Sequence, residues 1–434
     1  MRSSAEKISL FSTSAGSNNL TPEEVKAARE KRKAEKEEYK RQKALKKQQQ
    51  QAAATTSSTA FEEVYYSNDD SNNENLPFGD YELVQSRENW SRREFTAIKD
   101  ISLADGRIWV RGRLHSIRIK GGSCFLVLRS DALNTVQGVF FKKSDDPDDA
   151  RMVKYLKTLT LESICDVQAE VVKPQSPVKS TSKQDVELQV HRIHAVNVAD
   201  SNLPFEIEDA SKSEAEILES EETDRPFARL GQELRLNNRW VDLRVPANNA
   251  IMKIRSGVCQ LYRESLYQQG FMEIQTPKLI SGESESGAGV FTTDYFGTKA
   301  MLAQSPQLYK QMAISADFGR VFEIGPVFRA ENSNTRRHLC EFTGLDFEMA
   351  IHEHYEEALV VAHDMFKHIF DGLEKNFAKE LAVIRKQYYS EPVVFTEKPC
   401  VIHWGEGVEI LKNLGYDMDD GFQDLTGEQV RTGK

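Results

Sequence analysis

Hydrophobic and polar positions alternate with a period of two between about residues 95 and 199, a pattern typical of half-buried β-strands. The pattern predicts three strands, a helix and two more strands, with the glycine pair at 121–122 as the first turn. In order, these elements cover residues 108–114, 124–129, 136–141, 148–157, 164–172 and 186–196. This order is typical of an OB-type barrel, which binds oligonucleotides on one face, although other small barrels and sandwiches share it.

The pattern changes after Trp240 to that of an α+β domain. It predicts a helix over 250–269 that stops at Gly270, then a strand running into 274–277. Two strands at about 321–329 and 341–351, joined by a polar loop, precede a helix over 353–377. Residues 200–235 are acidic and lack a clear period, which predicts an irregular hinge between the barrel and this domain.

Residues 1–80 differ in composition from everything that follows. Thr21 and Pro22, followed by two glutamates, predict a helix start. From there to Lys47, eleven Lys/Arg face six Glu, so the segment carries about +5. A basic helix with so small an apolar stripe could contact nucleic-acid phosphates without recognising the base sequence. The alternative is a charged helix that is simply exposed to solvent. Residues 48–76 have the low complexity of a linker.

The net charge of −10 and the sequence pI near 5.6 argue, as averages, against a nucleic-acid partner. Because that charge is a sum of about +5 in the N-terminal segment and about −15 elsewhere, it does not exclude one.

The five cysteines are widely spaced and form no C-x-x-C pair, which excludes a zinc ribbon and argues against a disulfide framework. The nine histidines are scattered, and we predict no metal site from them. The chain has neither an apolar run of about 18 residues nor an apolar N-terminal signal core. Together these features predict a cytoplasmic protein without a membrane segment.

The segment from Gly325 to Phe342 contains the strongest candidate ligand-binding residues. Arg329 can pair bidentately with phosphate, and Glu331 can accept a hydrogen bond from an adenine amino group. Phe342 offers a face on which a ring can stack. The alternative is an ordinary hairpin with a polar turn, but several matched roles at this spacing favour a nucleotide site.

This segment resembles motif 2 of the class II aminoacyl-tRNA synthetases, and the strand that ends at Pro277 resembles motif 1, the dimer-forming element. Within that family the sequence is most similar to eukaryotic cytosolic aspartyl-tRNA synthetases. The similarity is carried by Thr276-Pro277-Lys278-Leu279, Ser284-Glu285-Ser286-Gly287, Ser305-Pro306-Gln307-Leu308-Tyr309-Lys310, Gly325 to Asn334 and Glu341-Phe342-Thr343-Gly344-Leu345-Asp346.

The resemblance implies an aspartate–tRNA ligase that makes aspartyl-adenylate from L-aspartate and ATP and transfers the aspartyl group to tRNA(Asp). Lys310 would face the side-chain carboxylate of aspartate, and Arg329 would bridge the amino-acid carboxylate and the α-phosphate as the catalytic residue. The implied aspartate-binding residues are Ser284, Glu285, Gln307, Lys310, Arg329 and Asp346. The implied ATP-binding residues are Arg329, Glu331, Arg337, His338, Leu339 and Phe342, with Pro277 at the interface of a homodimer.

In the barrel, the resemblance implies that the anticodon is contacted by Arg118, Phe125 and Gln137, with Phe125 stacking on a base. Phe125 could instead be a core aromatic residue of its strand. The basic N-terminal helix is similar to a lysine-rich extension that grips the tRNA backbone, here through Lys43, Lys46 and Lys47.

The sequence departs from the family after about Phe395, where nothing resembles the glycine-rich motif 3. The fold class expected is therefore α+β multidomain, with a basic N-terminal helix (1–80), an OB-fold barrel (90–200), an acidic hinge (201–235) and an incomplete class II antiparallel-sheet catalytic domain flanked by helices (236–434). We expect a truncated chain with weak or no activity, and magnesium ligands for ATP in the part that is lacking.

Two alternatives stay open. One is a ligase of the same subclass for asparagine or lysine. The other is a non-catalytic, tRNA-binding or regulatory fragment.

Overall fold

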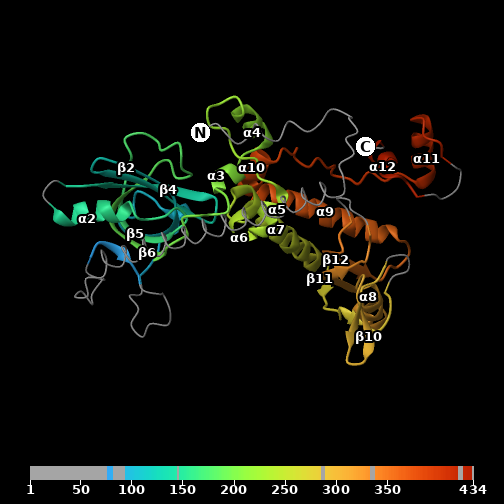
Figure 1. The fold of residues 1–434 in the computed structure, drawn as a ribbon. Coiled ribbons are helices and arrows are strands. Elements are labelled where there is room, and N and C mark those ends of the chain that lie inside the picture. Colours follow the sequence, from blue (N-terminus) through green and yellow to red (C-terminus); the bar gives the residue numbers. More distant parts are fainter. Residues whose placement is uncertain are drawn as a thin grey trace, which may run out of the picture. The chain divides into compact units, whose positions relative to one another are not determined.

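The computed structural model describes residues 76–81, 93–143, 146–284, 289–332, 338–418 and 424–432 (Figure 1). The helix predicted within 21–47, with Lys43, Lys46 and Lys47, lies outside these residues. Glu285 and Arg337 lie outside them as well. By its contacts the chain divides into two units, Met1–Leu76 and Pro77–Lys434, and the second contains all of the elements described below.

Residues 107–197 form the predicted OB-fold barrel. Its elements are β2 (Arg107–Lys120), β3 (Ser123–Ser130), β4 (Asn134–Phe141), α2 (Pro147–Leu156), β5 (Ile164–Val172) and β6 (Glu187–Asn197). The strands follow the order β4-β3-β2-β5-β6 with antiparallel pairing, and a short parallel pairing of β4 with β6 closes the barrel. A further short strand, β1 (Phe78–Asp80), pairs in parallel with β6.

The barrel folds as predicted because its alternating apolar side chains converge on one interior. Val110 and Leu114 on β2, Leu126 on β3 and Val167 on β5 are each 0–1% exposed. Asp146 accepts a hydrogen bond as the N-cap of α2, and Pro147 opens the helix, so its start is fixed by local sequence. Burying such a core is the dominant favourable contribution to folding.

The acidic segment 200–235 is only partly irregular: it contains the short helices α3 (Ile207–Ala210) and α4 (Glu214–Ser220), which were not predicted, and the start of α5 (Gln232–Asn237). Helix α6 (Arg239–Asp242) follows it. A capping box between Ser213 and Glu216 starts α4. A small core includes Phe205, Ile207, Val241 and Val245. The helices were missed because their few apolar positions are far apart in an acidic background and meet only in the tertiary structure.

The remaining described residues contain an α+β domain around a sheet with the strand order β12-β11-β7, beside a second sheet with the order β8-β10-β9. The elements are α7 (Pro246–Gln268), β7 (Met272–Glu273), β8 (Leu279–Ile280), β9 (Thr292–Tyr295), β10 (Thr298–Leu302), α8 (Gln307–Ala313), β11 (Arg320–Phe328), β12 (Glu341–Met349), α9 (Glu356–Asn376), α10 (Ala378–Gln387), α11 (Trp404–Asn413) and α12 (Gly427–Thr432). Helix α11 belongs to a separate small core of Val408, Leu411 and Met418. The predicted hairpin and the two long helices are confirmed. The strand expected to reach 277 ends at Glu273.

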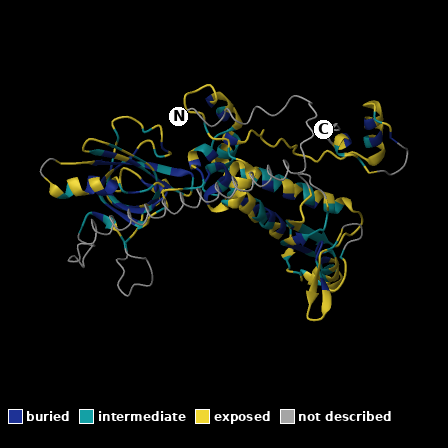
Figure 2. Ribbon diagram, viewed as in Figure 1, coloured by how far each residue is buried: buried dark blue, intermediate teal, exposed yellow. Residues whose placement is uncertain are grey.

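The core of this domain lies where α7 and α9 pack beside the sheet. Leu261, Tyr262 and Leu266 on α7 belong to the same core as Phe322 on β11, and all four are 0–2% exposed. Figure 2 shows buried residues gathered inside the barrel and along these helices. A Cβ atom on Gly372 of α9 would collide with the Leu261 side chain, so only glycine permits this approach of the two helices.

Candidate functional site

A buried lysine sits between two carboxylates on the edge strand β12. Lys310 Nζ lies 3.2 Å from Asp346 Oδ1 and 3.5 Å from Glu348 Oε2, and its side chain is 5% exposed. Gln307, three residues earlier on α8, donates its amide to Glu348 Oε2 at 3.3 Å. The helical spacing puts Gln307 and Lys310 on one face, and strand alternation puts Asp346 and Glu348 on one face. Three residues predicted to bind aspartate thus come together.

The cluster contains one ammonium group and two carboxylates, so it can offer both signs of charge to a zwitterionic ligand. An ammonium buried to this degree needs partners, because desolvation strongly disfavours an unpaired charge. Lys310 also donates toward the carbonyl of Phe347 at 3.5 Å, so all of its contacts point toward β12. Glu348 was not predicted, although the alternation from Asp346 to the next residue on the same face gives the signal.

Ser284 and Arg329 meet on the backbone of Gln304, which is fully buried. Ser284 Oγ accepts a hydrogen bond from Gln304 N at 3.1 Å, and Arg329 Nε donates to the Gln304 carbonyl at 3.4 Å. The segment before α8 is itself tied to β11, since Phe328 N donates to the Ala303 carbonyl at 3.0 Å. Ser284 and Arg329, the predicted catalytic residue, are therefore both held by the backbone of Gln304.

The ladder of β11 and β12 places the predicted nucleotide-binding residues on one hairpin. Val327 pairs with Phe342 in register, and the guanidinium carbon of Arg329 lies 5.6 Å from the Phe342 ring centre. Arg329 N donates to the Cys340 carbonyl at 2.9 Å. An arginine beside an aromatic face can hold a phosphate next to a stacked base.

Two more predicted ATP-binding residues face each other across the same hairpin, while a third is separate. Glu331 and His338 are 3.8 Å apart, both partly accessible. Leu339 is 59% exposed and has no described contact with them.

Glu323, a residue not predicted, connects the predicted dimer element to this sheet. Its carboxylate accepts hydrogen bonds from Thr276 N and Oγ1 at 3.0 and 2.7 Å, and from Lys278 Nζ at 3.0 Å. Glu323 is 4% exposed and stands opposite Asp346 in the ladder. Pro277 lies between the two clamped residues and its side chain is exposed. The carboxylate therefore fixes both neighbours of Pro277 to the sheet that carries Asp346.

The part of the chain that the structure describes holds no group of three or more His, Cys, Asp or Glu side chains placed to bind a metal ion. The magnesium that accompanies ATP stays a prediction.

A second candidate site is a groove of about 1100 Å³ between one face of the barrel and the helices α3, α4, α7 and α10, here called the barrel groove. The predicted anticodon residues Arg118, Phe125 and Gln137 all line it, from β2, β3 and β4. Arg118 pairs in register with Phe125. Phe125 is 38% exposed, so its ring is not part of the barrel core, contrary to the alternative above. Gln137 donates its side-chain amide to Glu187 at 2.5 Å.

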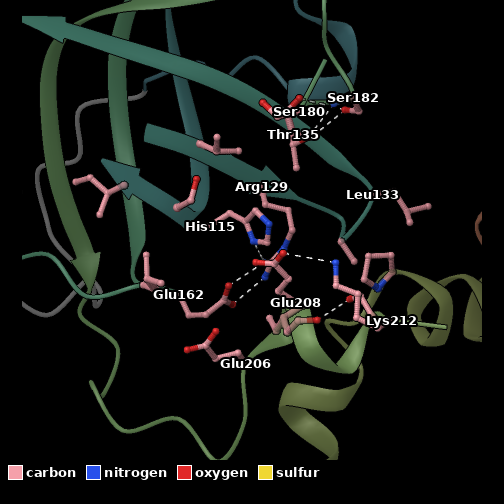
Figure 3. A pocket seen from close by; sticks show the side chains of 18 of the residues that line it. His115, Arg129, Leu133, Thr135, Glu162, Ser180, Ser182, Glu206, Glu208 and Lys212 are labelled. Carbon is pink, nitrogen blue, oxygen red and sulfur yellow. Dashed lines mark hydrogen bonds and ion pairs between the residues drawn. The ribbon is translucent and has the colours of Figure 1, made fainter. Parts of the chain in front are cut away.

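The loop between β5 and β6 forms part of the groove's rim. Ser182 and Thr135 exchange hydrogen bonds, from Thr135 N to Ser182 Oγ and from Ser182 N to Thr135 Oγ1, both at 2.8 Å (Figure 3). Another part of the rim comes from α3 and the residues that follow it, where Lys212 Nζ lies 3.6 Å from Glu208 Oε1. The groove therefore presents an aromatic ring, basic groups and hydroxyls together, a combination suited to single-stranded nucleic acid. Glu206, Glu208 and Glu216 add carboxylates on the side of α3 and α4.

The floor of the groove contains a buried ionic network. Arg129 donates two hydrogen bonds to the Glu162 carboxylate at 2.8 Å each and contacts His115 Nδ1 at 2.8 Å (Figure 3). Burial alone would raise the pKa of Glu162, but hydrogen bonds and charge from Arg129 and Arg244 outweigh it and lower that pKa. Burial and the charge of Arg129 lower the pKa of His115.

Comparison with protein families matches residues 231–427 to the class II tRNA synthetases for D, K and N, and residues 108–196 to an OB-fold nucleic acid binding domain. The chain is 44% identical over 345 residues to the cytoplasmic aspartate–tRNA ligase of Homo sapiens, covering 79% of this chain and 67% of that protein. It is 41% identical to the Caenorhabditis elegans enzyme of the same name, covering 79% and 64%.

Two solved structures show the same arrangement. The aspartyl tRNA synthetase from Entamoeba histolytica superposes with a TM-score of 0.72 at 37% identity, covering 82% of this chain and 71% of that one. A putative aspartyl-tRNA synthetase from Leishmania major gives 0.66 at 41% identity, covering 77% and 62%. Within the described residues, no helix is both long and apolar enough to cross a membrane. The identity of 44% to an enzyme of which it covers 67%, together with the family match, shows that the chain belongs to the class II aminoacyl-tRNA synthetases, in the group of the aspartate–tRNA ligases.

Proposed function

We propose that this chain binds L-aspartate and ATP between α8 and the β11–β12 hairpin, forms aspartyl-adenylate there, and transfers the aspartyl group to the 3′ end of tRNA(Asp). The observation that carries the proposal is the buried Lys310 between Asp346 and Glu348. A buried ammonium is the simplest device for choosing a carboxylate over the neutral amide of asparagine.

In this proposal, the cluster around Lys310 binds both the side-chain carboxylate and the α-amino group of aspartate. Lys310 pairs with the side-chain carboxylate, while Asp346 helps to hold the α-amino group, with Ser284, Glu285 and Gln307 completing the pocket. Asp346 and Glu348 orient the lysine before the substrate arrives, because its Nζ lies 3.2 and 3.5 Å from their carboxylate oxygens. Preorganisation of this kind lowers the cost of binding.

Arg329 then serves the reaction itself. It bridges the amino-acid carboxylate and the α-phosphate of ATP, where negative charge develops in the transition state. Glu331, Arg337, His338, Leu339 and Phe342 hold the nucleotide, with the Phe342 ring beside the Arg329 guanidinium at 5.6 Å. The substrate carboxylate attacks the α-phosphorus and pyrophosphate leaves, so the protein needs no nucleophile and works by positioning and charge. Magnesium enters with ATP as part of the substrate.

The barrel groove would hold the anticodon. Phe125 stacks on a base, and Arg118 and Gln137 form hydrogen bonds with base edges or backbone. Lys43, Lys46 and Lys47 would contact phosphates without reading sequence. Two chains would associate through the element around Pro277. The protein would act in the cytoplasm, because the names of its relatives call them cytoplasmic.

Pyrophosphate exchange with aspartate, asparagine and lysine in parallel tests the proposal. We expect exchange above the blank with aspartate alone, at whatever absolute rate the chain supports. Calorimetric titration with the three amino acids gives the same comparison without turnover. Equal responses to aspartate and asparagine would contradict the role of Lys310. A chain that binds tRNA but neither binds nor activates an amino acid would be the non-catalytic tRNA-binding protein instead.

A further inference from the structure

The Glu162 carboxylate joins the barrel face that carries Phe125 to the segment just before α7, the helix that packs on β11. Glu162, in the turn before β5, accepts two hydrogen bonds from Arg129 of β3 and a third, at 3.0 Å, from Arg244. The side chains of Arg129, Glu162 and Arg244 are 3%, 4% and 20% exposed. Buried charges persist only when they are paired and hydrogen-bonded, and here each pairing crosses between segments far apart in sequence.

The local backbone does not explain why this residue is a glutamate. Glu162 has a φ of 71°, in the left-handed region that favours glycine or asparagine. Its backbone is already engaged, since Glu162 N donates to the Leu114 carbonyl at 2.8 Å and its own carbonyl accepts from Arg113 at 3.1 Å. The turn needs no carboxylate, so the contacts of the side chain with Arg129 and Arg244 account for this residue type.

The two arginines belong to different functional parts. Phe125, Val127 and Arg129 alternate along β3 and line the barrel groove together, so Arg129 shares a face with the ring proposed to stack on RNA. Arg244 follows α6, stacks over Trp240 at 5.1 Å and stands two residues before Pro246, the first residue of α7. Helix α7 packs on β11 through Tyr262 and Phe322.

We propose that Glu162, through Arg129 and Arg244, is a positioning residue that holds the barrel groove in a fixed orientation on the start of α7, so that one tRNA can reach both the groove and the catalytic site. The inference rests on the proposed function, because it assigns the orientation a use in tRNA binding. Two sites held at a fixed spacing bind one long ligand with a high effective concentration, and a loose joint lowers that concentration.

Arg244→Gln is the discriminating change, because it removes the contact of Glu162 with Arg244 and leaves the Arg129–Glu162 pair of the barrel in place. It also leaves the hydrogen bond that Lys379 of α10 donates to Asn134 of β4 at 2.6 Å. We expect its affinity for an isolated anticodon stem-loop to stay within about twofold of the unmodified chain, while its affinity for whole tRNA falls about tenfold. Arg244→Lys keeps a cation and should restore part of that loss. Asp166→Asn is the matched control, since Asp166 pairs with Arg111 at 2.6 Å entirely inside the barrel. It should not change the ratio of the two affinities.

Hydrogen exchange on the RNA-free chain gives a second, independent measurement. Arg244→Gln should speed the exchange of amides in residues 239–250 and leave strands β2 to β6 as they are. Unchanged exchange in 239–250, or equal losses for stem-loop and whole tRNA, would overturn the positioning role. If the unmodified chain binds neither the stem-loop nor whole tRNA, the proposed function fails for the barrel. Faster exchange in residues 239–250 of the Arg244→Gln chain would in that case still support the role of the Glu162–Arg244 contact in holding the barrel on the start of α7.

Discussion

Lys310 and Asp346, 36 residues apart in the chain, form an ion pair with Nζ 3.2 Å from Oδ1, and the lysine is almost completely buried. Replacing Lys310 with Ala removes the proposed partner of the substrate's side-chain carboxylate and leaves Asp346 and Glu348 without their cation. We expect aspartate-dependent pyrophosphate exchange to fall about 10²–10³-fold, as when a single preorganised charge donor is lost from an active site.

The control for that change is Lys299→Ala, because Lys299 lies exposed on β10 and contacts nothing in the cluster. It should leave the exchange rate and aspartate binding unaltered. Undiminished use of aspartate by the Lys310→Ala chain would remove the role assigned to this residue.

Phe125 gives a prediction for the barrel groove. Its ring is 38% exposed and lies 6.3 Å from the Phe141 ring in an edge-on arrangement. Replacing Phe125 with Ala should weaken binding of an anticodon stem-loop by about 1–3 kcal/mol, the range for loss of one stacked base. Fluorescence anisotropy at fixed salt measures it. Phe296→Ala, on the β9–β10 turn and 94% exposed, is the control that should bind as before. A Phe125→Ala chain with unweakened binding would refute stacking.

Gly372 tests the packing of α9 on α7. On an open helix surface, Gly→Ala stabilises by about 1 kcal/mol. At Gly372 the new methyl group would collide with Leu261, which is 2% exposed and cannot move aside without disturbing the core. We therefore expect Gly372→Ala to lower the free energy of unfolding by about 1–3 kcal/mol, as overpacking does.

Urea titration measures that change, and Gly407→Ala provides the comparison. A methyl group on Gly407 of α11 would lie 3.9 Å from the Ile402 side chain, an ordinary van der Waals contact, so this substitution should be neutral or stabilising. The steric explanation would be wrong if both changes stabilised the chain.

His115 predicts a specific dependence of stability on pH. Arg129 can only donate, so the contact with His115 Nδ1 requires a ring nitrogen without a proton. Burial, followed by the charge of Arg129, lowers the pKa of the folded histidine below its unfolded value of about 6.5. As pH falls through that value, the unfolded chain takes up a proton that the folded chain does not, so stability decreases.

His115→Gln should therefore flatten the loss of stability between about pH 7.5 and 5.5, measured as the shift in the urea midpoint of barrel unfolding. Part of the loss should remain, because burial also lowers the pKa of His191. An identical pH dependence in the two chains would exclude His115 as a source of it.

The local pattern of the sequence was sufficient for the barrel and for the main elements of the α+β domain. Strand alternation and helix caps act over a few residues, so β2 to β6, α2 and the β11–β12 hairpin follow from neighbouring side chains. The resemblance in turn named Gln307, Lys310 and Asp346, which the structure brings together.

The tertiary structure alone decided which charges are buried and what they connect. Glu323 and the joint of Glu162 with Arg244, 82 residues away in the chain, have no local signature, because their partners come from other elements. The short helices after the barrel likewise depend on a shared core. The physical reason is that a charge can leave water only where folding supplies its counter-charge, and that meeting depends on the path of the whole chain.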